Sequence, residues 1–102
     1  MAKYNVVVAE RADKMLVRHA RFLAKASKPA ALRLADGFEA LLRELGDNPY
    51  QFPAETDANL PKGLYRKALF CKRYKAVFMV EDRNVYLDAV LDCRQENRRL
   101  PF

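Results

Sequence analysis

Three segments in the second half of the chain have the residue pattern of β-strands. They cover residues 65–70, 74–81 and 85–94 and are rich in β-branched and aromatic side chains, which suit a pleated sheet. Only short gaps separate them, and short gaps between consecutive strands favour hairpins. The sequence therefore predicts an antiparallel three-stranded meander.

Side chains alternate between the two faces of a sheet, so residue parity predicts which positions lie together. A two-residue turn at residues 82–83 or 83–84 puts the apolar positions of the last two strands on one face. A two-residue turn around Lys72 adds Tyr65 and Leu69 to that face. The apolar set is Tyr74, Ala76, Phe78, Val80, Val85, Leu87, Ala89, Leu91 and Cys93. The opposite face then carries the charged side chains of the candidate site: Arg66, Lys75, Asp88, Asp92 and Arg94.

The first half of the chain is predicted to support this sheet. Residues 4–8 indicate a first strand, and from about Ala9 to Lys25 apolar residues recur at helical spacing. Ser27 and Pro29 predict the start of a second helix, because serine caps helices and proline is tolerated in the first turn. Its apolar stripe is Leu34, Phe38, Leu41 and Leu45, and Gly46 followed by Pro49 predicts its end.

These elements predict a two-layer α+β fold in the order β-α-α-β-β-β, an antiparallel sheet with an N-terminal helical hairpin packed on one face. Gly37 lies inside the second helix at a cost of about 1 kcal/mol relative to alanine, so it marks either a close helix contact or a tolerated defect. Residues 47–63 hold three prolines and no clear period. We expect one long connection there, held by Tyr50, Phe52 and Leu60.

Length and composition fit a single domain, residues 1–102, with one core. About half of the 102 residues are hydrophobic, enough to fold without disulfides. No apolar run of about 18 residues could cross a bilayer, and no signal-peptide core follows Met1, so we expect a cytoplasmic protein. Cys71 and Cys93 lack metal-site spacing, which favours buried or idle thiols.

The net charge of +6 is unevenly distributed. Residues 62–102 hold ten Lys or Arg against five Asp or Glu, whereas residues 1–61 hold nine against eight. Such an excess indicates a nucleic acid or an acidic protein as partner, or else only soluble surface charge. Five cations of the first helix recur at steps of three and four residues and form one stripe: Arg11, Lys14, Arg18, Arg21 and Lys25. This first-helix stripe is either a solvated face or a docking site for an acidic partner.

Two motifs make the resemblance to a known family specific. They are Leu60-Pro61-Lys62-Gly63 leading into Tyr65-Arg66, and a last strand that ends in Asp92-Cys93-Arg94-Gln95. With the order of elements, they resemble the RelE/ParE superfamily of bacterial type II toxins over nearly the whole chain. The resemblance implies a small toxin neutralised by a cognate antitoxin that wraps around it. RelE-like members cleave messenger RNA on the ribosome, and ParE-like members inhibit DNA gyrase without cutting nucleic acid.

The resemblance implies that Arg66, Lys75 and Arg94 occupy positions similar to basic residues of the RelE-like site. Metal-independent RNA cleavage also needs a base and an acid. RelE-like enzymes carry a tyrosine or histidine near the last-strand arginine, but residues 95–99 contain neither. Ala68 also stands where those ribonucleases tend to carry a second lysine.

Other side chains supply weaker candidates for an acid or base. His19 lies on the first helix without a catalytic motif, and we expect it to be structural. Tyr86 could act as the acid, with Asp88 or Asp92 as the base. A simpler expectation is that Asp92 lies across from Lys75, as a turn at residues 83–84 predicts, and only stabilises the sheet.

These departures favour the ParE-like branch. We expect a toxin that inhibits DNA gyrase by protein binding and is neutralised by an acidic antitoxin, which docks in part on the first-helix stripe. The alternative is a ribosome-dependent endonuclease with the ribosome and messenger RNA as partners, and a third possibility is a degenerate toxin that only binds antitoxin. No cofactor, metal, membrane or small-molecule substrate is implied.

Overall fold

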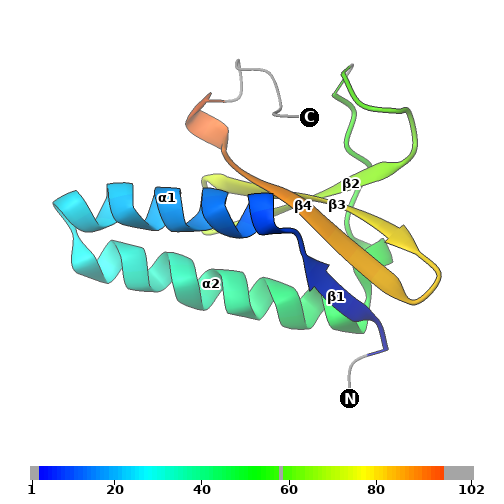
Figure 1. Ribbon diagram of the computed structural model, residues 1–102, viewed down its shortest axis with the longest axis horizontal. Coiled ribbons are helices and arrows are strands. Elements are labelled where there is room, and N and C mark those ends of the chain that lie inside the picture. Colours follow the sequence, from blue (N-terminus) through cyan, green and yellow to red (C-terminus); the bar gives the residue numbers. More distant parts are fainter. Residues whose placement is uncertain (1–2, 58, 96–102) are drawn as a thin grey trace.

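Two helices pack on one face of a four-stranded mixed sheet in the computed structural model, which describes residues 3–57 and 59–95 (Figure 1). The α+β fold predicted from the sequence is confirmed. The sheet order is β1-β4-β3-β2, with β1 at Asn5–Val8, β2 at Tyr65–Phe70, β3 at Tyr74–Glu81 and β4 at Asn84–Asp92. β2, β3 and β4 form the antiparallel meander, and β1 adds to β4 in parallel, which makes the sheet mixed.

The helices form an antiparallel hairpin with almost no connecting loop. α1 spans Glu10–Ala26 and α2 spans Lys28–Asp47, so Ser27 alone separates them. The Ser27 hydroxyl accepts the backbone N–H of Ala30 at 3.2 Å, and Pro29 occupies the first turn, which confirms the predicted cap. In the described part of the chain no helix combines the length and hydrophobicity needed to cross a membrane.

The main core lies between the hairpin and the sheet. The predicted stripe of α2 is buried, and α1 adds Ala12 together with half-buried apolar side chains. The sheet contributes Ala68 and Phe70 from β2, Tyr74, Ala76 and Phe78 from β3, and Val85, Leu87 and Val90 from β4. Burial of this continuous apolar surface is the dominant stabilising term.

The register of β4 changes halfway along the strand. The β3–β4 turn is Asp82-Arg83, one of the two predicted alternatives. Val77 is then paired with Ala89 but Phe78 with Leu87, so Asp88 is an extra residue and forms a β-bulge. Beyond the bulge the parity is inverted. The predicted apolar face of β4 therefore holds only through Leu87, after which Val90 and Asp92 lie on the helix side.

The register of β2 differs from the prediction because the β2–β3 turn has three residues. Phe70 pairs with Tyr74, which leaves residues 71–73 in the turn. Arg66, Ala68 and Phe70 therefore lie on the helix side of the sheet. The expectation that Tyr65 and Leu69 join the apolar face is wrong, and the Leu69 side chain is 67% exposed.

The long segment before β2 covers the outer edge of that strand and part of the helix-free face. It begins with a 3-10 turn at Pro49–Gln51 (η1), and Pro53 and Glu55 then bond to the backbone of β2. Phe52 packs edge-to-face on Phe78, and Leu60 is buried against Val77 and Ala89 on the helix-free face. Tyr50 is instead half exposed.

Candidate functional site

The three cations predicted to share one basic face lie in three different environments. Arg66 is on the helix side of β2, opposite Phe78. Its guanidinium donates to the carbonyl oxygen of Phe52 at 2.7 Å and lies over the Tyr50 ring, 4.9 Å from the ring centroid. The shared face expected for Arg66 and Lys75 is wrong, because the three-residue turn shifts β2 by one position.

Lys75 lies on the helix-free face and forms a buried ion pair. Its Nζ is 2.6 Å from Oε1 of Glu55, and the two side chains are 18% and 3% exposed. The other carboxylate oxygen of Glu55 accepts the N–H of Thr56 at 2.8 Å. The Lys75 contact is an ion pair rather than a well-directed hydrogen bond. The pair holds the segment before β2 against the sheet.

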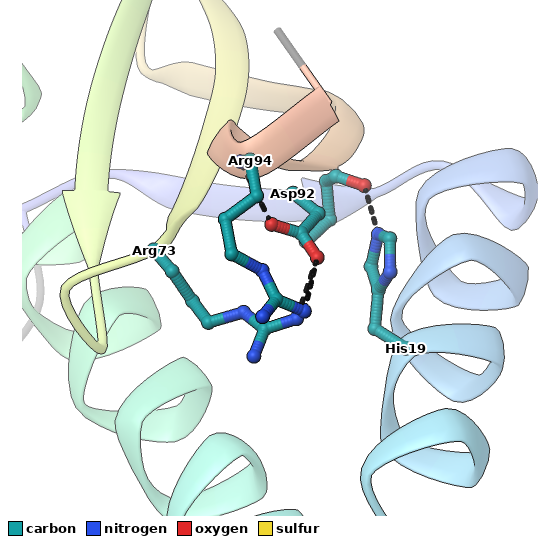
Figure 2. A network of polar contacts seen from close by, with 5 residues as sticks. His19, Arg73, Asp92 and Arg94 are labelled. Carbon is teal, nitrogen blue, oxygen red and sulfur yellow. Dashed lines mark hydrogen bonds and ion pairs between the residues drawn. The ribbon is translucent and has the colours of Figure 1, made fainter.

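Arg94 belongs to a network at the end of β4, shown in Figure 2. It lies in a short 3-10 turn, Cys93–Gln95 (η2), where its backbone N–H donates to Asp92 Oδ1 at 3.0 Å. Asp92 Oδ2 accepts from Arg73 Nη2 at 2.7 Å, and the Arg94 guanidinium is 3.6 Å from the same oxygen. Asp92 is buried and faces the helices. The expected pairing of Asp92 with Lys75 is wrong, because it required a turn at residues 83–84, whereas the turn is Asp82-Arg83 and the β-bulge then sets Asp92 opposite Tyr74.

His19 attaches α1 to this network. Its Nε2–H donates to the carbonyl oxygen of Val90 at 2.8 Å (Figure 2), and its ring centroid is 5.3 Å from that of Tyr74. The Arg73 guanidinium lies 5.1 Å from the Tyr74 ring centroid. Burial raises the pKa of the Tyr74 phenol; Arg73 opposes this shift and Asp92 reinforces it. His19 therefore makes the structural contact expected of it.

The remaining acid and base candidates lie away from Arg94. Tyr86 is half-buried on the helix-free face, opposite Met79 and Val7. Asp88, in the bulge, interacts with Tyr65 on that same face. Burial raises the pKa of the Tyr65 phenol, Asp88 raises it further, and Arg11 opposes the shift. The sheet therefore separates these groups from the Arg73–Asp92–Arg94 network.

The stripe predicted on the first helix lies on α1, and the five cations of this α1 stripe are exposed and follow the outward side of the helix. Lys14 forms an exposed i,i+4 ion pair with Glu10 at 3.1 Å. Two exposed apolar side chains flank the stripe, Val17 at 40% and Phe22 at 62% exposure. One hollow of the surface is lined by Lys14, Val17, Arg18, Arg21, Phe22 and Lys25 together with one acidic residue, Asp13. This surface and the Arg73–Asp92–Arg94 network can bind anions, but among the described residues they include no placed acid–base pair.

Arg73 is the residue of this network that the sequence did not indicate. It lies in the turn between two strands, where parity says nothing about the direction of a side chain. Its partner Asp92 is brought within reach only by the bulge in β4. A loop arginine in a basic chain carries no local signal that could have identified it.

Comparisons with known proteins agree with this architecture. The family model for the ParE toxin of type II toxin–antitoxin system, parDE, matches residues 6–97. No curated protein matches the sequence. A solved chain of the chromosomal ParDE TA system from P. aeruginosa has a similar fold, with a TM-score of 0.71 and 13% sequence identity over 88% of this chain and 96% of that chain. Because the family model covers most of the sequence, the chain belongs to the ParE toxin family of type II toxin–antitoxin systems.

Proposed function

We propose that this chain is a ParE-like toxin that inhibits DNA gyrase by protein binding in the cytoplasm and is neutralised by a cognate acidic antitoxin. Membership of the ParE toxin family supports the toxin role. The similar solved chain comes from a ParDE toxin–antitoxin system, which supports an antitoxin as partner.

The observation that favours binding over RNA cleavage is the separation of Arg66, Lys75 and Arg94. An endonuclease must bring cations, a base and an acid to one phosphate. Here Arg66 binds a backbone carbonyl on one side of the sheet, and Lys75 binds Glu55 on the other. A placed acid or base typically contributes about 10²- to 10⁴-fold. A protein that acts by binding needs none of these groups.

The α1 stripe is proposed as part of the antitoxin-binding surface. All five cations are exposed, and Lys14 pairs with Glu10 of the same helix. An acidic segment that folds on binding would satisfy these charges and cover Val17 and Phe22. The affinity should weaken as salt rises, and reversing the charges of Arg18 and Arg21 together should weaken it further.

Induction of the toxin without antitoxin tests the mechanism. We expect DNA synthesis, followed by thymidine incorporation, to stop before messenger RNA is depleted. Primer extension on RNA taken soon after induction should show no codon-specific cuts. Cuts within translated messages that disappear in an Arg94→Ala variant would replace this proposal with the endonuclease, and Tyr86 would then be the first acid to test.

A further inference from the structure

We propose that Arg73 and Arg94, oriented by Asp92, form an anchor for one carboxylate of the acidic antitoxin segment. The proposal rests on the proposed function, because it names a contact through which the antitoxin would hold this chain. It adds a second site, at the end of β4 and beside α1, to the α1 stripe.

The Arg73–Asp92–Arg94 network carries more positive charge than its single carboxylate neutralises. Two guanidiniums meet one buried Asp92, whose Oδ1 and Oδ2 are already engaged at 3.0 and 2.7 Å. A guanidinium has several N–H donors in a fixed fork, and the contacts described here use few of them. Arg73 Nε is enclosed and out of reach of a ligand, but 25% of the Arg73 side chain is exposed. The cluster therefore retains a net charge of +1 and has donors for another oxyanion.

The geometry prepares these donors for a ligand. Figure 2 shows the Arg73 and Arg94 side chains, from the β2–β3 turn and from η2, ending beside the same oxygen of Asp92. The Arg94 side chain is 59% exposed, so a ligand can reach it. Because Asp92 already restrains both arginines, less side-chain entropy is lost when an anion binds. Forked donors of this kind match a carboxylate or a phosphate.

The surroundings favour a carboxylate on a peptide over a phosphate of nucleic acid. The His19 bond to Val90 places α1 next to the network. Phe22 lies three residues after His19, on a neighbouring part of the helix surface, and is 62% exposed. A duplex keeps its bases stacked and would leave this ring uncovered, whereas a peptide with apolar residues between acidic ones covers the ring and pairs the arginines.

Fluorescence anisotropy on the full chain tests the anchor. The probe is a labelled synthetic peptide of glutamate, leucine and alanine with the acidic residues at helical spacing. Arg94→Gln should weaken its binding about ten-fold. Arg94→Lys should weaken it nearly as much, because an ammonium cannot form the fork. Arg43→Gln, an exposed arginine on α2, removes the same charge and should change affinity by less than about two-fold.

Three outcomes would overturn the anchor. Equal losses in Arg94→Gln and Arg43→Gln would show that only net charge matters, and absence of binding to the wild-type chain would exclude the peptide site. The site would be assigned to nucleic acid if a labelled DNA oligonucleotide bound more tightly than the peptide and if Arg94→Gln weakened the binding of the oligonucleotide but not that of the peptide. The replication assay in cells uses neither probe, so failure of the anchor and failure of the proposed function can be told apart.

Discussion

Gly37 makes a contact that predicts an unusual response to alanine. It lies in the middle of α2, and a Cβ atom built there would meet Cys71 Sγ, from the β2–β3 turn, far inside van der Waals contact. Phe70 Cδ2 and Cys71 Cβ are at 3.8 and 4.0 Å, which an added methyl tolerates. The sulfur atom alone therefore opposes the substitution. Of the two sequence-based alternatives for Gly37, the structure supports the close contact, with a turn residue rather than a helix as the partner.

Two opposing free energies determine the effect of Gly37→Ala. Alanine improves helix propensity by about 1 kcal/mol. Overpacking a tight contact costs roughly 1–3 kcal/mol, and moving the Cys71 sulfur breaks the bond that its thiol donates to the carbonyl oxygen of Arg33 at 3.6 Å. The single variant should therefore be destabilised by about 0–2 kcal/mol. In a Cys71→Ala background the obstacle is gone, and the same substitution should stabilise the chain by about 1 kcal/mol.

A double-mutant cycle measured by urea denaturation checks this reasoning. The free energies of unfolding of the wild type, both single variants and the double variant are compared with one common value for the slope against urea concentration. The coupling free energy between the two substitutions should be about 1–3 kcal/mol. Additivity within about 0.5 kcal/mol would refute the contact. A coupling of the expected size in which Gly37→Ala still destabilises the Cys71→Ala chain would show that the backbone, not the sulfur, is the obstacle.

Two other predictions follow from buried polar groups. Lys75→Met should lower the free energy of unfolding by about 3–5 kcal/mol, because Glu55 would remain buried without a counter-charge. Adding Glu55→Gln to this variant should recover most of the loss. If urea denaturation showed the double variant to be as unstable as Lys75→Met, this explanation would be wrong. Stability should fall as the pH rises above about 10, because the pKa of Tyr74 is higher in the folded than in the unfolded chain and the folded state then binds more protons. In denaturation curves recorded at a series of pH values, Tyr74→Phe should make the unfolding free energy depend less on pH. An unchanged pH dependence would mean that the Tyr74 phenol does not contribute.

Local patterns were sufficient to predict most of the fold. The helical stripe from Leu34 to Leu45 and the cap at Ser27 depend on neighbouring residues, and both are confirmed. The meander also follows from local signals. The parallel addition of β1 to β4 does not, because it joins the two ends of the described chain and no residue pattern specifies that pairing.

The candidate site was predicted less well because it depends on register. A parity argument assigns faces only if every turn length and bulge is known, and a one-residue error inverts the whole set. The turn at Cys71 has three residues instead of two, with positive φ at both Cys71 and Lys72. Neither residue type favours that conformation, so no local signal indicated the longer turn. Arg66 was moved to the other face for this reason alone.

The bulge at Asp88 has the larger consequence for function. Without the extra residue, parity from the Asp82-Arg83 turn would place Asp92 on the helix-free face with Lys75. With it, Asp92 turns toward the helices and binds Arg73, and it receives Arg94 beside α1. One inserted residue thus turns Asp92, and with it the Arg94 contact, away from the face where RNA chemistry was considered. Because a bulge of this kind re-aims the side chains beyond it, it separates the charged groups that an endonuclease would need together, which supports the proposal that this chain acts by binding.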